Sequence, residues 1–539
     1  MLSRRTLLEA ATLFPLFHFA SAPLLAAAGG GFTHSVASGD PSPHAVVLWT
    51  RFVPPGGGYA ALKVEVAQDE AFTRIVMRGM ASAGPETDFC AHAHVDGLMP
   101  GRWYYYRFIT ADGQTSPVGR TRTLPVGRLD SFRIGVVSCA NATSGWFNGY
   151  AHAAARDDLD LIVHTGDYIY ESPIDRADAL AGLAAARHIQ PNGAAVSLSD
   201  YRLRYASYRA DPGLLELHRR FPMIIMWDDH EVANNSWQNG AKDHDLQDGS
   251  WDMRKGAGVR AFREWLPMGN RDYAAYQIGN LATLFRLETR LIARSKQLEL
   301  APILLAPDRA AALNAFLNGP LADPARTMMG ARQEQWLADA LAKSTATGTR
   351  WQVIAQQVIV APTRLPKVTS AWYSPGDKPG AREQFELSAA EALGAAGVPT
   401  ALDRWDGYPA ARKRLFDSAI RANAKLIMLS GDSHNGWAFN LEQDGKPIGV
   451  EFAGHSISSL GLEKRFSGDP AGIARDILAV NPALKWCDTS QRGYMVVDLH
   501  PRRVTSEWLF LPSRGISSTA ILGSHTETAE YGAQRLSGL

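Results

Sequence analysis

The sequence predicts an α/β fold with a small all-β domain in front of it. From Phe32 to about Thr123, short β-branched and aromatic runs are separated by turn-forming residues, a pattern typical of a small β-sandwich. After Pro125, apolar strands end in polar residues and alternate with helical stretches such as Arg254–Trp265. Alternating strands and helices indicate an α/β domain, in which sites form at the carboxyl ends of the strands.

Length and composition restrict the class of protein. The chain has 539 residues, too many for a single domain of roughly 100–200 residues. Its 46% of hydrophobic and 20% of charged residues allow a large packed core and exclude wholesale disorder. The net charge of +1 gives no indication of a nucleic-acid partner or an anionic membrane. Three cysteines are too few for a disulfide scaffold or a structural zinc cluster.

The first 28 residues have the pattern of an export signal. Arg4 and Arg5 precede an apolar run that ends near Ala28, and the paired arginines resemble a twin-arginine signal. Pro15 and His18 interrupt this run, whereas a membrane-spanning helix needs about 20 predominantly apolar residues. We therefore expect export by the twin-arginine machinery to the periplasm or medium, cleavage near Ala28, no stable membrane anchor, and a monomer.

The loop after the second strand of the α/β domain carries the first candidate site. The apolar strand Leu159–Val163 runs into Gly166 and Asp167, and a carboxylate in this position can bridge two hard cations. Tyr170 can add a phenolate, which only a strong Lewis acid such as Fe(III) would hold. The alternative is that Asp167 caps a helix and Tyr170 packs in the core, and the residues alone leave both interpretations open.

The loop after Phe221–Met226 is unusually rich in charge. Asp228, Asp229, His230 and Glu231 follow one another, with Asn235 just beyond. Such a run is costly to bury unless a cation offsets it. A solvated loop is the alternative, which the apolar lead-in disfavours. His230 is a candidate metal ligand or general acid.

Two further strand ends repeat this theme. Asp432 and His434 follow Lys425–Leu429 and stand two residues apart, so both can ligate one ion. Cys139 follows Phe132–Val137. A lone cysteine is usually an inert buried side chain, but beside metal-capable residues a thiolate ligand is an equally open interpretation.

The order of these motifs resembles the calcineurin-like metallophosphoesterases, and more specifically the PhoD-type alkaline phosphatases, over roughly residues 32–500. The resemblance rests on the strand-end motifs above together with these segments: Val36–Pro41, Val46–Arg51, Asp200–Arg209, Trp405–Tyr408 and Arg492–Tyr494. It implies a two-sheet metallophosphoesterase sandwich flanked by helices and preceded by the small β-sandwich. The expected division is a signal peptide at 1–28, the β-sandwich at 29–125, the catalytic domain at 126–512 and a C-terminal tail at 513–539.

The resemblance also implies a function. The family hydrolyses phosphate monoesters and diesters with Fe(III) and Ca²⁺, here expected for phosphate scavenging from small phosphate esters by in-line attack of a metal-bound hydroxide. Cys139 and Tyr170 would bind iron, and Asp167 would bridge iron and calcium. The other expected site residues are the metal ligands Asp229, Asp432 and His434 and the catalytic residues His230, Asp229 and Asn235.

Two departures from the family pattern concern the substrate. Glu288 stands in Leu287–Arg290 where the family usually has Asp, and His455 stands where Thr is common, so no substrate preference is carried over. A purple acid phosphatase is one alternative, disfavoured because Asp229 replaces Asn and Asp432 replaces His. A non-catalytic binding protein on a decayed phosphoesterase scaffold is another, disfavoured because every expected strand end keeps its ligand.

Overall fold

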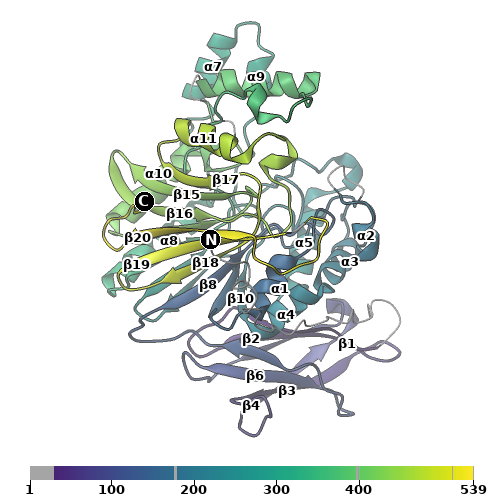
Figure 1. The fold of residues 1–539 in the computed structure, drawn as a ribbon. Helices are drawn as coiled ribbons and strands as arrows, with labels where there is room; N and C mark the ends of the chain where they lie inside the picture. The colour runs from purple at the N-terminus through teal and green to yellow at the C-terminus, as the bar shows by residue number, and fades with distance from the viewer. Residues whose placement is uncertain (1–29, 175–178, 396–397, 400, 513, 538–539) are drawn as a thin grey trace, which may run out of the picture.

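Two large β-sheets face each other in the computed structural model, which describes residues 30–174, 179–395, 398–399, 401–512 and 514–537 (Figure 1). The expected export signal lies outside these residues. The first sheet has nine strands in this order: β20 (Gly523–Glu530), β19 (Arg503–Leu511), β18 (Arg492–Leu499), β8 (Phe132–Val137), β9 (Leu161–His164), β10 (Pro222–Ile225), β1 (Gly31–Gly39), β2 (Val46–Val53) and β5 (Cys90–Val95).

The second sheet has seven strands, and its central strands are parallel. Their order is β11 (Ala274–Ile278), β12 (Ala282–Arg286), β13 (Trp351–Ala355), β14 (Leu426–Ser430), β16 (Lys446–Ala453), β15 (Gly436–Gln443) and β17 (Leu484–Asp488). A shared core joins the sheets, in which Val136, Val163 and Ile224 of the first pack with Ile427 and Phe452 of the second. Because β8, β9, β10 and β14 are buried on both faces, they read in the sequence as continuous apolar runs.

Helices cover the outer face of each sheet, as expected (Figure 1). The nine-stranded sheet is covered by α1 (Asn148–Ala155), α3 (Leu198–Arg209), α4 (Pro212–Arg220) and α5 (Trp251–Trp265). The seven-stranded sheet is covered by α8 (Gly330–Ala346), α10 (Pro409–Arg421) and α11 (Pro470–Val480). Shorter or peripheral helices are α2 (Leu183–Ala186), α6 (Ala301–Leu304), α7 (Arg309–Asn318) and α9 (Ala381–Ala395). In the described ranges, no helix combines the length and apolar character needed to cross a membrane.

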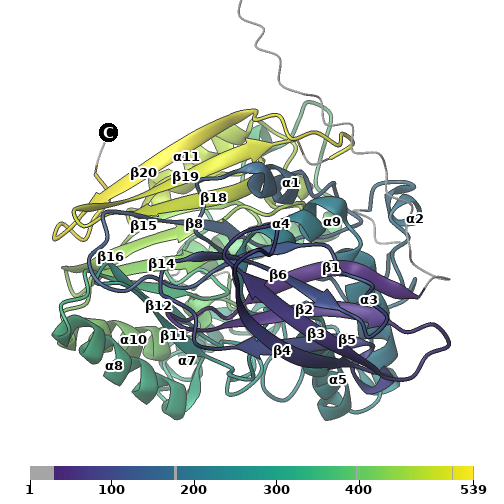
Figure 2. The same cartoon turned by 90° about the horizontal axis from the view of Figure 1, so that it is seen from below.

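The N-terminal β-sandwich shares a sheet with the α/β part of the chain. Its second layer is a four-stranded sheet of β4 (Ile75–Ala83), β3 (Ala60–Ala67), β6 (Trp103–Ile109) and β7 (Gly119–Arg122), which packs on β1, β2 and β5 (Figure 2). Ser38 and Gly39 of β1 pair in parallel with Pro222 and Met223 of β10. This pairing satisfies backbone groups that two separate sheets would leave at open edges. The boundary expected at residue 125 therefore does not separate two independent sheets.

The C-terminal segment also differs from expectation. Instead of a tail throughout 513–539, residues Gly523–Glu530 form β20, which pairs antiparallel with β19 at the edge of the nine-stranded sheet. This strand reads Gly-Ser-His-Thr-Glu-Thr-Ala-Glu and lacks an apolar run. One face of an edge strand is solvated, so the hydrophobic signal of the central strands is missing here.

Candidate metal centre

The predicted site residues gather because the strands that carry them end at one edge of the molecule. Strands β8, β9 and β10 are parallel neighbours in the first sheet, with Val137 and Ile225 each paired to His164. Strand β14 lies in the facing sheet. The loops after these strands meet at their carboxyl ends, where open α/β sheets form their sites.

Sharp turns aim the side chains of these loops. The backbone angle φ is positive at four of these residues: 57° at Cys139, 55° at Asp167, 60° at Asp432 and 62° at His434. The left-handed region is disfavoured for residues other than glycine and is found preferentially where function requires it. Asn235 adopts it as well, with φ of 51°. The backbone thus turns directly at the residues that the sequence singles out.

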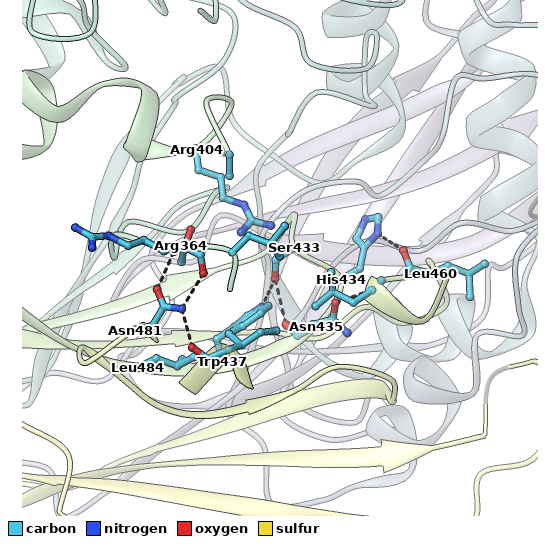
Figure 3. A pocket seen from close by; sticks show the side chains of 15 residues that line it. Arg364, Arg404, Ser433, His434, Asn435, Trp437, Leu460, Asn481 and Leu484 are labelled. Carbon is cyan, nitrogen blue, oxygen red and sulfur yellow. Dashed lines mark hydrogen bonds between the residues drawn. The ribbon is translucent and has the colours of Figure 1, made fainter. Parts of the chain in front are cut away.

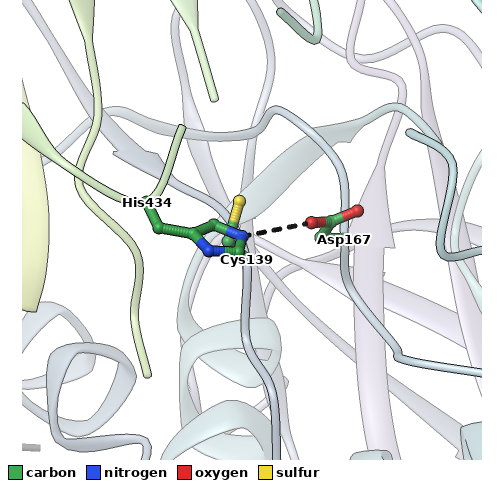
Figure 4. Close-up of side chains that lie close together, drawn as sticks. All are labelled: Cys139, Asp167 and His434. Atoms are coloured by element: carbon green, nitrogen blue, oxygen red, sulfur yellow. Dashed lines mark ion pairs between the residues drawn. The ribbon is translucent and has the colours of Figure 1, made fainter. Parts of the chain in front are cut away.

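The first cluster joins three candidate ligands from three loops (Figure 4). Cys139, Asp167 and His434 offer ligand atoms that all lie within 4.8 Å of one another. Nδ1 of His434 donates to the carbonyl of Leu460 at 2.7 Å, and its Nε2 lies 3.8 Å from Oδ2 of Asp167. Burial, together with the nearby Asp167, raises the pKa of the Cys139 thiol well above its usual value. A thiolate in this position therefore needs a cation to stabilise it.

Tyr170 completes this cluster, and Tyr168 does not. The hydroxyl of Tyr170 donates to Oδ2 of Asp167 at 2.8 Å, accepts from Ser459 at 2.7 Å and lies 3.1 Å from Nε2 of His434. Burial and the Asp167 charge raise its pKa well above the usual value, so only a strong Lewis acid would deprotonate it. The hydroxyl of Tyr168 instead lies 2.8 Å from Nε2 of His218.

A second cluster lies on the other side of Asp167. Asp229 and His230 bring ligand atoms within 4.8 Å of Asp167 and of each other. Nδ1 of His230 lies 2.6 Å from Oε2 of Glu171. Burial alone would favour a neutral imidazole, but the charges of Glu171 and Asp229 raise the pKa of His230 well above its usual value. Glu171 therefore favours the protonated form of His230, and this pair lies directly beside the candidate ligands.

A third cluster surrounds a buried arginine. Asp228, Asp229 and Asp432 bring carboxylate oxygens within 4.8 Å of one another. Arg290, whose side chain is fully buried, donates to Asp228, to Oδ1 of Asp432 at 3.2 Å and to Oδ2 of Asp403 at 2.7 Å. The acidic run is thus buried as expected, and the protein itself supplies one of the cations that offset it.

The donor set fits metal ions. Oδ1 of Asp167 and Oδ2 of Asp228 are buried and have no hydrogen-bond partner among the described residues. Leaving a buried carboxylate oxygen without a partner is costly, and a bound cation removes that cost. A thiol, a phenol, an imidazole and a carboxylate suit iron, whereas carboxylate and amide oxygens suit calcium.

Asn235 reaches this site through its backbone. Its N–H donates to Oδ2 of Asp229 at 2.7 Å, and its carbonyl accepts from Gln297 at 3.0 Å. Its side-chain amide makes no hydrogen bond to a described residue. The backbone thus holds Asn235 beside Asp229 and leaves its side-chain oxygen without a partner among the described residues.

Two residues of the site, Glu231 and Asp403, have no role assigned from the sequence. Glu231 accepts from the backbone N–H groups of Asp167 at 3.2 Å, Tyr168 at 2.5 Å and Asp228 at 2.7 Å, which ties two loops together. Burial and the nearby Asp167 raise its pKa to about 8. The only feature of the sequence that points to Asp403 is its position just before the Trp405–Tyr408 motif.

The two departures from the family pattern have different surroundings. Glu288 accepts from the indole N–H of Trp227 at 2.9 Å and from the backbone of Arg290 at 2.8 Å, so it supports the buried arginine. His455 is buried with Nε2 3.0 Å from the carbonyl of Leu509 and packs on Phe510. It therefore faces β19 rather than the metal centre.

Comparisons with known proteins identify the family. The model of the family described as "PhoD-like phosphatase" matches residues 134–508, and that of its N-terminal domain matches residues 20–125. The chain belongs to the PhoD-like phosphatase family. It is 33% identical over 513 residues to alkaline phosphatase D of Bacillus subtilis (strain 168), covering 89% of this chain and 78% of the relative. The predicted family and enzyme class, a phosphoesterase hydrolase, are thereby confirmed.

Solved structures confirm the predicted fold. The structure of PhoD superposes with a TM-score of 0.74 at 28% identity, covering 95% of this chain and 92% of that one. A purple acid phosphatase from yellow lupin (Lupinus luteus) seeds has a TM-score of 0.54 at 11% identity, covering 92% of this chain and 74% of that one. The similarity to the purple acid phosphatase concerns the fold alone. The matches to the PhoD-like family therefore favour that family over the purple acid phosphatase alternative.

Proposed function

We propose that the chain is an exported phosphatase and phosphodiesterase that uses Fe(III) and Ca²⁺ to hydrolyse small phosphate esters. The observation that carries this proposal is the cluster of Cys139, Asp167, Tyr170 and His434, in which one buried oxygen of Asp167 has no hydrogen-bond partner among the described residues. Without a bound ion, burying these polar groups together would destabilise the fold, because each of them is costly to bury.

The two kinds of donor divide between the two ions. Cys139, Tyr170, His434 and Asp167 would hold iron, because thiolate and phenolate suit a strong Lewis acid. Calcium prefers oxygen ligands, and Asp167, Asp229, Asp432 and Asn235 would supply them. When bound, such ions lower the pKa of a water molecule and neutralise charge on the phosphoryl oxygens.

The chain's own residues orient the substrate and handle the proton. Glu171 holds Nδ1 of His230, so Nε2, which has no hydrogen-bond partner among the described residues, can donate a proton to the leaving oxygen. The ring of Tyr170 packs against His230 with centroids 4.2 Å apart and fixes the tilt of the imidazole. Arg290 holds Asp228 and Asp432 in place by donating a hydrogen bond to each carboxylate. Positioning of this kind accounts for much of phosphoryl-transfer catalysis.

Hydrolysis of chromogenic esters tests the proposal. Purified mature protein should release p-nitrophenolate from p-nitrophenyl phosphate or from bis(p-nitrophenyl) phosphate. EGTA should abolish this activity and Ca²⁺ should restore it. Mg²⁺ should restore little, because it requires a tighter octahedral site and releases its waters reluctantly. Protein that binds these esters without turning them over would instead support the non-catalytic alternative.

Export has its own test. The paired Arg4 and Arg5 motivate the proposal of passage through the twin-arginine machinery. Replacing both by lysine keeps the charge of the segment and removes the paired arginines. The unchanged chain should be found in the periplasm or medium, and the double variant should remain in the cytoplasm. Equal export of both would contradict this part of the proposal.

A further inference from the structure

A pocket of about 350 Å³ opens beside His434 and is not used by the metal centre itself (Figure 3). It lies between the loop after β14 and segments that come from β17, α11 and the loops around residues 364, 404 and 460. A volume of this order is that of a small-molecule site. Because His434 contributes both to this pocket and to the first cluster, a group bound at the metal centre can extend into it.

One side of this pocket is apolar and rigid. Leu460, Leu462, Ile477 and Leu484 provide aliphatic surface, and Trp437 provides an aromatic one. The indole N–H of Trp437 donates to Oγ of Ser433 at 2.9 Å, which fixes the ring. The apolar side is therefore preformed and suits the hydrocarbon part of a ligand.

The charged groups of this pocket have one sign. Arg364 and Arg404 line it, and none of its described lining residues is acidic. The side chain of Arg404 extends toward Ser433 in Figure 3 and has as its one charged partner among the described residues Oδ2 of Asp432, at 3.5 Å from its Nε. Its terminal N–H groups make no hydrogen bond to a described residue, so they are available to an anion.

Arg364 is held by its backbone rather than by its side chain. Its N–H donates to Oδ1 of Asn481 at 2.7 Å, and its carbonyl accepts from Nδ2 of Asn481 at 2.9 Å. The side chain is exposed and has no partner among the described residues. A variant at Arg364 can therefore remove a charge from the rim of the pocket without disturbing the hydrogen bonds between the backbone of residue 364 and Asn481.

We propose that this pocket binds the ester group that a phosphodiester retains after cleavage, and that it selects an alcohol with a short apolar body and a negative charge. The inference rests on the proposed function, which places the leaving oxygen beside His230 and leaves the His434 side to the retained group. Apolar atoms of the alcohol contact the leucine wall, and its anion meets the N–H groups of Arg404, with Arg364 adding charge at the rim.

Two matched substrates test this inference. Both are p-nitrophenyl phosphodiesters with the same leaving group, and the second alcohol is either 2-carboxyethyl or propyl, which differ in charge. The unchanged protein should favour the carboxyethyl ester roughly tenfold in kcat/KM, the discrimination expected of one charge-assisted contact. A ratio of the two values cancels any general loss of activity in a variant.

Variants assign the preference to the pocket. Arg404→Gln should bring the ratio close to one, and Arg364→Gln should lower it less because its side chain is screened by solvent. Arg332→Gln, at an exposed arginine of α8, is the control and should keep the ratio. Ala401→Trp, at a partly exposed position of the lining, should fill the pocket and reduce turnover of both diesters more than that of p-nitrophenyl phosphate.

The outcomes separate this inference from the proposed function. Protein that hydrolyses both diesters with equal kcat/KM, or whose preference survives Arg404→Gln, overturns the inference and leaves the phosphoesterase intact. Protein that hydrolyses none of the three esters in the presence of iron and calcium overturns the proposed function and the inference with it.

Discussion

The hydroxyl of Tyr170 donates a 2.8 Å hydrogen bond to Oδ2 of Asp167, three residues earlier in the loop after β9. The same carboxylate leaves its other oxygen, Oδ1, buried without a partner among the described residues. One oxygen of Asp167 thus faces the Tyr170 cluster, and the other is free for a second ion. This arrangement is what a carboxylate that bridges two cations requires.

Replacing Tyr170 by Phe removes one oxygen and should change the colour of the protein. A phenolate bound to Fe(III) absorbs visible light through charge transfer, so the band should shift or vanish in Tyr170→Phe. Turnover should fall by at least the roughly 10–100-fold that loss of an outer-shell partner costs a metal site. Visible absorption and kcat of the purified protein measure both effects.

Tyr168→Phe is the matched control for Tyr170→Phe. Its hydroxyl contacts His218 and not the cluster, so the band and the turnover should both persist. The free energy of unfolding should fall by about 1 kcal/mol, the net contribution of one hydrogen bond. A spectrum that is unchanged in Tyr170→Phe, in protein that contains iron, would make Tyr170 a packing residue.

Asp167→Asn should abolish activity without unfolding the protein. The amide keeps the shape of the side chain and removes the charge that would offset two ions, so turnover of a chromogenic diester should be lost nearly completely. Without metal, the variant should be at least as stable to urea as the unchanged chain, because one charge fewer is buried. Near-normal turnover at saturating calcium would refute the bridging role.

Arg290→Lys tests the arginine at the centre of the third cluster. Lysine keeps the charge but loses the planar fork that reaches Asp228, Asp403 and Asp432 together. We expect weaker calcium retention in dialysis and turnover lowered roughly 10–100-fold, as for other groups that orient metal ligands. Arg286→Lys, at a buried arginine that donates to backbone carbonyls, should lower stability and leave calcium retention unchanged. Equal calcium retention in both variants would contradict the positioning role.

The stability of the protein should depend on pH through His34, which belongs to none of the three clusters. Burial, helped by the positive charges of Arg51 and Arg209, lowers the pKa of His34 from 6.5 to about 3. Between about pH 3 and pH 6.5 His34 is protonated in the unfolded chain and neutral in the folded chain. Its contribution to stability is therefore retained above pH 6.5 and decreases as the pH falls below that value. His34 should therefore contribute a loss of about 2 kcal/mol between pH 7.5 and pH 5.

Urea unfolding of the unchanged chain and of His34→Gln isolates this contribution. Glutamine does not titrate, so the variant should lose about 2 kcal/mol less over the same pH interval. Other titrating groups act on both proteins and cancel in the comparison. Parallel stability curves for the two proteins would show that His34 is not held neutral by the fold.

The sequence predicts those parts of the site that depend on strands. Asp167, Asp229 and Asp432 each follow a continuous apolar run, and parallel strands bring their carboxyl ends to one edge, so their meeting could be foreseen. Arg290 and Asp403 lie in loops far along the chain, and no local pattern relates an arginine to the carboxylates that it will contact. Packing of the two sheets brings Arg290, which follows β12, to Asp228, which follows β10.

The same distinction applies to the fold. Layers and helices follow from apolar periodicity, whereas the joining of β1 to β10 and the addition of β20 depend on backbone hydrogen bonds. Backbone groups are alike in every residue, so pairing at a sheet edge leaves little trace in the side chains. The polar strand Gly523–Glu530 illustrates this, because it has no apolar run to announce it.

The central claim is that phosphoesterase activity depends on iron and calcium held by the cluster around Asp167. Elemental analysis of the active protein as purified, with Asp167→Asn prepared in parallel, tests this claim most directly. We predict iron in stoichiometric amount and calcium in the active protein, and loss of both metals in the inactive variant. Fully active protein that contains neither iron nor calcium would contradict the account.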